Sequence, residues 1–131
     1  YGRLWGIAMY PGQMIKIVDR YITALNAHDM AAVLEIYDAD ATLEDPVGTE
    51  PRRGMSQIRE LYEMAFAQNI TARLNGDVRI AANFAAFPFA VALRPEGRAF
   101  KLEVIDVFEF NDTGKIIAQK AYWGPENLSR L

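Results

Sequence analysis

The stretch RAFKLEVIDVFEF, residues 98–110, alternates apolar and polar side chains over most of its length. Alternation with a period of two is typical of a β-strand with one face in a core. Gly97 precedes the stretch and Asn111 to Gly114 follow it, and both segments are turn sequences between alternating runs. We therefore predict a run of strands joined by hairpins, which cover residues 72–80, 85–93, 98–110 and 115–123.

The first half of the chain instead carries apolar residues at helical spacing. The spacing predicts a helix over residues 14–27, a second helix that Asp29 caps and that ends near Asp38, and a third that begins at Ser56. Each predicted helix places one tyrosine in its apolar stripe, and these are Tyr21, Tyr37 and Tyr62.

A short alternating run, residues 41–45, lies between the second and third predicted helices and ends at Pro46. Helices that come first and strands that follow indicate an α+β domain. We expect three helices packed on one face of a curved, mostly antiparallel sheet, with a cone-shaped apolar interior that suits an apolar ligand. One domain spans residues 14–131, after an N-terminal extension, residues 1–13, of unknown role.

The composition limits the classes of function. The chain has 131 residues, and 51% of them are hydrophobic. Its 14 basic and 17 acidic side chains give a net charge of -3. The basic residues form no cluster, which argues against a protein that binds nucleic acid. It has no cysteine and one histidine, His28, so we expect no metal and no cofactor. No apolar run is long enough for a bilayer, and we expect a cytoplasmic protein that binds no membrane.

Asp106 is the least expected residue of the opening stretch. Strand alternation places it on one face with Leu102, Val104, Phe108 and Phe110. Aspartate is depleted from strand interiors, and burial would raise its pKa, so that a neutral carboxylic acid could stabilise negative charge on a ligand oxygen. A buried ion pair with an arginine, or a hydrogen bond to a tyrosine, would explain the same placement without catalysis.

Two further sets of residues have both a functional and a structural interpretation. Asp45 shares a strand face with Ala41 and Leu43, yet Asp-Pro-Val-Gly is also an ordinary turn sequence. Paired carboxylates whose pKa values differ would supply a base and an acid. The three tyrosines could form a hydrogen-bond network that ends on a ligand, or could simply be core residues.

Other polar and aromatic residues have plainer interpretations. We expect His28 to be a solvent-facing capping residue and the pair Arg52 and Arg53 to lie in a solvated loop. Several aromatic residues belong to the core by default and some could also form pocket walls, namely Phe66, Phe87, Phe89, Phe108 and Trp123.

Five segments together resemble the bacterial Δ5-3-ketosteroid isomerases, which share the fold of nuclear transport factor 2. They are DRYITALNA (19–27), YDADATLEDPVG (37–48), IRELY (58–62), VIDV (104–107) and AYW (121–123). The similarity runs from about Met14 to Leu128.

The resemblance implies a role for each matching residue. Asp45 matches the base that moves a proton within a 3-oxosteroid, and Tyr21 and a protonated Asp106 match the donors to the dienolate. These isomerases are themselves the established example of a carboxylic acid kept neutral to donate a hydrogen bond. Tyr37 and Tyr62 match the tyrosines that brace the catalytic phenol. The substrate-binding set is then Trp123, Phe89, Phe87, Leu61, Gln119, Phe66 and Val104.

Two of these positions depart from the family pattern. Leu61 stands in place of a common phenylalanine, and Gln119 replaces an apolar pocket residue. Because a changed pocket wall alters which ligand fits, the resemblance does not identify the preferred substrate. The resemblance also implies a homodimer, to which the apolar Ile105 and Val107 on the outer sheet face would contribute. A non-catalytic steroid- or lipid-binding module is the alternative. Epoxide hydrolysis and polyketide cyclisation are further alternatives, although a hydrolase would need an arginine in a pocket-facing strand position.

Overall fold

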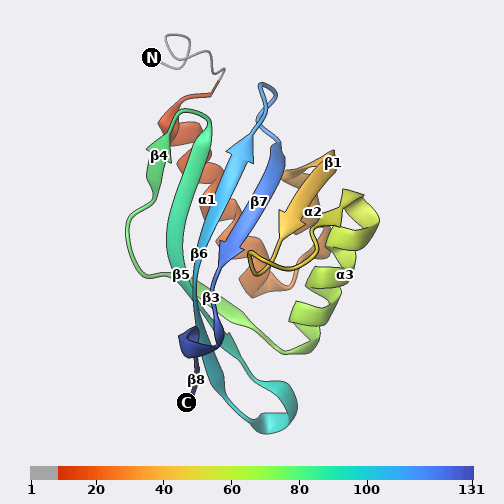
Figure 1. Cartoon of the computed structure of the whole chain (residues 1–131), viewed down its shortest axis with the longest axis vertical. Helices are drawn as coiled ribbons and strands as arrows, with labels where there is room; N and C mark the ends of the chain where they lie inside the picture. The colour runs from red at the N-terminus through yellow and green to blue at the C-terminus, as the bar shows by residue number, and fades with distance from the viewer. Residues whose placement is uncertain (1–8) are drawn as a thin grey trace.

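The computed structural model describes residues 9–131, and in Figure 1 three helices lie against one side of a single curved sheet. The helices are α1 (Pro11–Ala27), α2 (Met30–Glu35) and α3 (Gly54–Ala67). The strands are β1 (Tyr37–Glu44), β2 (Arg52–Arg53), β3 (Thr71–Leu74), β4 (Arg79–Ala81), β5 (Phe84–Leu93), β6 (Phe100–Phe110), β7 (Ile116–Tyr122) and β8 (Leu128–Arg130). This architecture confirms the predicted α+β fold.

The sheet has the strand order β2-β1-β7-β6-β5-β3, with β4 added to β5 and β8 added to β6. Strands β5, β6 and β7 form the predicted antiparallel meander, in which β5 and β6 pair along nearly their whole length. Strand β1 pairs with β7 in parallel and places Leu43 opposite Gln119. Strand β7 therefore lies between β1 and β6 (Figure 1).

The alternation predicted for the central strand is confirmed. Val104, Asp106, Phe108 and Phe110 of β6 are buried, whereas Ile105 is 49% exposed on the opposite face. The buried stripe of α1, which includes Val18 and Tyr21, belongs to the same core as these strand residues.

The second helix is shorter than predicted. It ends at Glu35, and Tyr37 is the first residue of β1 instead of the last apolar residue of a helix. Tyr37 pairs with Ile116 of β7, whose backbone N–H donates to the carbonyl of Ile36. Pairing with a strand far along the chain therefore overrides the helical spacing, although Tyr37 remains buried as expected.

The segment predicted as one strand, residues 72–80, is divided between β3 and β4. A Cβ atom at Gly76 would lie 2.7 Å from Cγ of Pro88 on β5, so glycine is the residue that fits against this proline ring. Strand β8 was not predicted, and α3 begins at Gly54 instead of Ser56.

His28 is a capping residue as predicted, at the C-terminal end of α1, but its side chain is half-buried and does not face solvent. It adopts the left-handed conformation at the end of α1, its Nε2 contacts the carbonyl of Ile70 at 2.8 Å, and its ring stacks on Phe66. His28 therefore joins the end of α1 to the segment that leads into β3.

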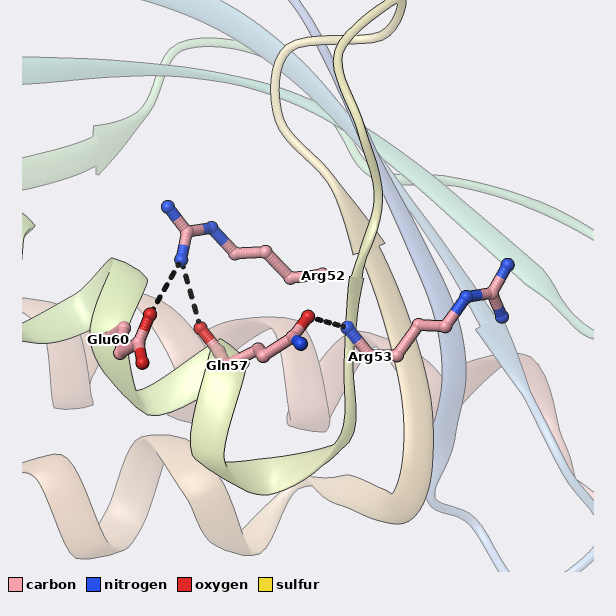
Figure 2. Close-up of polar contacts among 4 residues, drawn as sticks. All are labelled: Arg52, Arg53, Gln57 and Glu60. Atoms are coloured by element: carbon pink, nitrogen blue, oxygen red, sulfur yellow. Dashed lines mark hydrogen bonds and ion pairs between the residues drawn. The ribbon is translucent and has the colours of Figure 1, made fainter.

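Arg52 and Arg53 do not form a solvated loop, because they are the two residues of β2 and pair with β1. The backbone N–H of Arg53 donates to Oε1 of Gln57, while the Arg52 guanidinium donates to the Gln57 carbonyl and pairs with Glu60 at 3.7 Å (Figure 2). The two side chains point away from each other, and the contacts fix the entry into α3 (Figure 2).

Of the predicted N-terminal extension, residues 1–8 lie outside the described residues. Met9 is buried in the core, Tyr10 is the N-cap residue of α1, and Pro11 to Gln13 already belong to α1. No helix among residues 9–131 is both long and apolar enough to span a bilayer.

Candidate active site

A mostly apolar cavity of about 190 Å³ lies between the helices and the inner face of the sheet. Helices α1 and α3, the end of β1, and strands β5 and β6 all contribute side chains. Its polar groups belong to Tyr21, Tyr62, Asp45 and Asp106. The other lining residues are Leu25, Leu61, Ala65, Ile70, Phe89, Val91, Leu93, Leu102, Val104 and Trp123.

Asp106 occupies the most enclosed position among the carboxyl groups of the cavity. It is 1% exposed, and Nε2 of Gln119 donates to its Oδ2 at 2.9 Å, while Oδ1 is buried without a hydrogen-bond partner. Burial, and secondarily the charge of Asp45, raises the pKa of Asp106 well above its ordinary value, against the opposing effect of the Gln119 amide. A neutral Asp106 would present a hydroxyl donor to a ligand.

The three tyrosines form a continuous chain of hydroxyl contacts. The hydroxyl of Tyr21 lies 2.9 Å from that of Tyr62, which in turn contacts the hydroxyl of Tyr37. Burial raises the pKa of all three phenols, which keeps them protonated at neutral pH. Tyr21 also packs edge-on against Phe108, so its ring is held in place by the core.

Asp45 follows the last residue of β1 and is only partly buried. The indole Nε1 of Trp123 donates to its Oδ1 at 2.7 Å. Burial raises the pKa of Asp45 above its ordinary value, while the Trp123 hydrogen bond and the charge of Arg52 act in the opposite direction. Two carboxyl groups in different surroundings thus line one cavity.

Gln119 is not a wall of the cavity, which corrects the prediction. It is 2% exposed on β7 and connects two parts of the site, because its Oε1 accepts from the hydroxyl of Tyr37 and its Nε2 donates to Asp106. Gln119 and Ala121 of β7 are both buried on the inner face of the sheet. An amide side chain at an inward-facing strand position is the sequence signal that could have identified this role.

Residues 18–119 match the family model described as "SnoaL-like domain". The match covers most of the 131 residues. The chain belongs to the SnoaL-like domain family.

A curated relative of this SnoaL-like domain is the Steroid Delta-isomerase of Nocardioides simplex, which is 36% identical over 111 residues. The alignment covers 85% of this chain and 89% of the relative. This match confirms the resemblance to steroid isomerases, and the homology supports an isomerase function.

A solved structure with the same fold as this SnoaL-like domain belongs to another kind of enzyme. It is an epoxide hydrolase/cyclase-like enzyme with a role in pyran ring formation in the polyether salinomycin. The TM-score is 0.87 at 25% identity, and the superposition covers 92% of this chain and 97% of the other. The fold is therefore shared by enzymes with other activities.

The predicted substrate-binding residues of the SnoaL-like domain divide into two groups. Leu61, Phe89, Val104 and Trp123 line the cavity. Phe66 and Phe87 do not, because Phe66 stacks on His28 and Phe87 is fully buried against Tyr21 and Phe108. Six wall residues were missed, since no polar or aromatic signal marks them: Leu25, Ala65, Ile70, Val91, Leu93 and Leu102.

A larger hollow of about 660 Å³ lies between α1 and α2, at residues that include Asp19, Arg20 and Lys115. Its charged lining mixes both signs, and it includes none of the carboxyl groups or tyrosines described above. Within residues 9–131 of the SnoaL-like domain, no cluster of three or more His, Asp or Glu side chains is arranged to hold a metal ion. The smaller apolar cavity is therefore the candidate active site.

Proposed function

We propose that the protein is a steroid Δ-isomerase that converts a Δ5-3-ketosteroid into the conjugated Δ4-3-ketosteroid. The observation that carries the proposal is the arrangement of Tyr21, Asp45 and Asp106 around one apolar cavity, with Asp106 fully buried and Asp45 partly open. Homology to a steroid isomerase points to the same reaction.

Asp45 is the proton carrier in this proposal. Its carboxylate removes a proton from C4, next to the carbonyl carbon, and the electron pair moves through the former carbonyl to give a dienolate. The carboxylic acid so formed returns the proton to C6, which regenerates Asp45 and leaves the double bond in conjugation. Atoms and electrons balance without any cofactor.

Tyr21 and neutral Asp106 are the donors to the ligand oxygen. Charge that develops on this oxygen lies in an apolar, enclosed site, where hydrogen-bond donors are more effective than in water. Tyr62 contacts the Tyr21 hydroxyl, and Tyr37 contacts the Tyr62 hydroxyl, so these two residues position Tyr21.

The size of the cavity constrains how a steroid would sit. A volume of about 190 Å³ is below the roughly 300 Å³ at which ligand pockets usually begin. We therefore place the ring that carries the oxygen beside Tyr21 and Asp106, and the remaining rings toward the open end near Leu61 and Leu93.

The test is an assay with a Δ5-3-ketosteroid, in which the conjugated product is followed by its absorbance. Asp45→Asn is expected to lower kcat by about 10²-fold or more, because proton transfer by a positioned side chain contributes about 10²–10⁴. The same variant should still bind a phenol. Steroid binding without turnover by the wild-type protein would instead favour the non-catalytic binding module.

A second candidate follows from the structural likeness to an epoxide hydrolase/cyclase-like enzyme. A neutral, buried Asp106 could protonate the epoxide oxygen as the epoxide C–O bond breaks, while Asp45 takes the proton of the substrate hydroxyl that attacks the ring carbon. However, the lining of the apolar cavity includes no arginine among the described residues, which favours the isomerase. Product analysis after incubation with a hydroxy-epoxide separates the two.

We also propose that the enzyme is a homodimer formed through the outer face of the sheet. Ile105 and Tyr122 lie opposite each other on neighbouring strands and are 49% and 46% exposed, and Phe84 on β5 is exposed as well. A sheet face with such a cluster gains free energy when a second copy covers it. Ile105→Glu should give monomers in sedimentation, whereas Met64→Glu, at an exposed apolar residue of α3, should not.

A further inference from the structure

The open end of the apolar cavity continues onto a part of the sheet that extends past the helices. Figure 1 shows the β5–β6 hairpin and β8 extending beyond the ends of α1, α2 and α3. Leu93 and Leu102, one from each strand of this hairpin, line the cavity and lie close to the hairpin turn. The same two strands therefore carry the inner face of the sheet from the cavity out past its mouth.

Strand pairing places three more side chains on this inner face. Directly opposite residues of an antiparallel pair project to the same side of a sheet. Phe100 pairs with Leu93, and Leu128 of β8 pairs with Leu102, so both project to the side of the cavity. Arg130 pairs with Phe100 and shares its face. Leu128 is 46% exposed, so an apolar surface here has room for a ligand. We call Phe100, Leu128 and Arg130 the ledge.

The outer end of the ledge carries positive charge. The guanidinium of Arg98 lies 6.0 Å from the centre of the Phe100 ring. Arg98 and Arg130 are both exposed, and neither belongs to an ion pair within the described part of the chain. Glu96 is the one acidic residue of the turn RPEGR (94–98), which contains two arginines. A positive site thus adjoins an apolar one, in a chain whose net charge is -3.

The length of β6 relates the ledge to the proposed position of the ligand oxygen. A strand rises about 3.3 Å per residue, so Phe100 lies about 20 Å from Asp106 along β6. An elongated ligand with its oxygen at Asp106 passes Val104 and Leu102, which both line the cavity. Its far end then approaches Phe100, where the long arginine side chains can reach it.

We propose that the ligand is an anionic steroid, which is a 3-oxosteroid with a carboxylate on the ring farthest from the 3-oxo group. Its oxygen contacts Tyr21 and Asp106, its rings follow the cavity onto the ledge, and its carboxylate pairs with Arg98 and Arg130. Arginine suits this role because its planar guanidinium matches the geometry of a carboxylate. The inference rests on the proposed function, since it uses the same cavity and the same position of the ligand oxygen.

Two Δ4-3-ketosteroids test the inference, one with a carboxylate on C17 and one with a primary amide there. They differ in charge but hardly in shape, and their binding requires no turnover. Calorimetric titration compares the wild-type protein with Arg98→Gln and Arg130→Gln. Each variant should lower the ratio of acid to amide affinity by about threefold, the effect of one exposed ion pair, so the wild-type ratio should be about tenfold. Higher ionic strength should lower the wild-type ratio, because salt screens exposed charges.

Arg73→Gln is the matched control, because it removes the same charge from the other face of the sheet. Ala72 pairs with the cavity-lining Val91, so strand alternation directs the next residue, Arg73, away from the cavity. This variant should keep the wild-type ratio. The combined variant of Arg98→Gln and Arg130→Gln should bind acid and amide equally, with the amide affinity unchanged. Thermal unfolding establishes that each variant is folded.

Equal affinities of the wild-type protein for acid and amide, or tighter binding of the amide, would overturn the inference. So would a wild-type ratio in both Arg98→Gln and Arg130→Gln, an equal loss in Arg73→Gln, or a folded wild-type protein that binds neither steroid. Failure of the proposed function would appear separately. The protein would then not isomerise the Δ5 acid, although its preference for the Δ4 acid still depended on the two arginines.

Discussion

The indole N–H of Trp123 donates a 2.7 Å hydrogen bond to Oδ1 of Asp45, across 78 positions of sequence. The donor is neutral, so it favours the ionised carboxylate without forming an ion pair. Burial of Asp45 has the opposite effect and is the larger of the two, which leaves the pKa of this carboxyl raised. A carboxylate with a raised pKa is a stronger base, as abstraction of a proton from carbon requires.

Trp123→Phe should move the acid side of the pH–rate profile to higher pH. In the proposed mechanism Asp45 acts as a base only when it is ionised, so kcat/KM should fall as the pH falls through its pKa. Loss of the indole donor removes an interaction with the ionised form, and the pKa rises further. The pH dependence of kcat/KM for both proteins measures this change, and a profile that stayed in place would show that the indole does not influence the base.

Arg52→Gln should shift the same profile in the same direction, because the positive charge of Arg52 lowers the pKa of Asp45. Arg53→Gln is the matched control. Its side chain points away from Arg52 and its N–H, not its guanidinium, makes the contact with Gln57 (Figure 2). Equal profiles for the two variants would contradict a specific effect of Arg52.

Asp106→Asn should make stability less dependent on pH. The folded-state pKa of Asp106 is raised, so its contribution is fully present below the unfolded-state pKa of about 3.9 and is lost as the pH rises toward the folded-state value. Asparagine does not titrate in this range. Urea unfolding at several pH values should show the variant gaining stability relative to wild type as the pH rises, while Asp112→Asn, in an exposed turn, follows the wild-type curve.

Asn26→Ala should destabilise the fold without touching the cavity lining. The Asn26 amide donates to the carbonyl of Ala72 at 2.8 Å and accepts from its N–H at 2.7 Å, which fixes α1 to β3. Loss of both hydrogen bonds should cost about 1–3 kcal/mol in the free energy of unfolding. Asn26→Asp, which keeps the acceptor, should cost less, and equal costs for the two variants would assign the effect to packing.

Local sequence patterns were sufficient to predict most of the helices and strands. Alternation predicted β6 and the burial of Asp106, since the face of a strand depends only on its own sequence and its register. Tyr37 was misplaced because the signal that ends α2 is the parallel pairing with β7, which is remote in sequence. Asp45 and Tyr21 were identified by resemblance, whereas their shared cavity is visible only in three dimensions.

The two hydrogen-bond partners of Gln119 could not be predicted from the sequence. Comparison with a family pattern marked it as unusual but assigned it to the cavity wall, because the pattern has an apolar residue there. Its two partners, Tyr37 and Asp106, come from different strands, and no spacing along the chain indicates that both reach one amide. Hydrogen-bond networks of this kind depend on distances that strand parity does not specify.

The parallel pairing of β1 with β7 also bears on how the protein is made. Asp45 and Tyr37 leave the ribosome early, but Trp123 and Gln119, their partners, follow some 78 and 82 positions later. Contacts between segments so far apart form late, because closing a long loop costs conformational entropy before any contact compensates. The helices and the β5–β6 hairpin can therefore associate on a growing chain before β7 is made, and the proposed active site is completed only when β7 and Trp123 have followed.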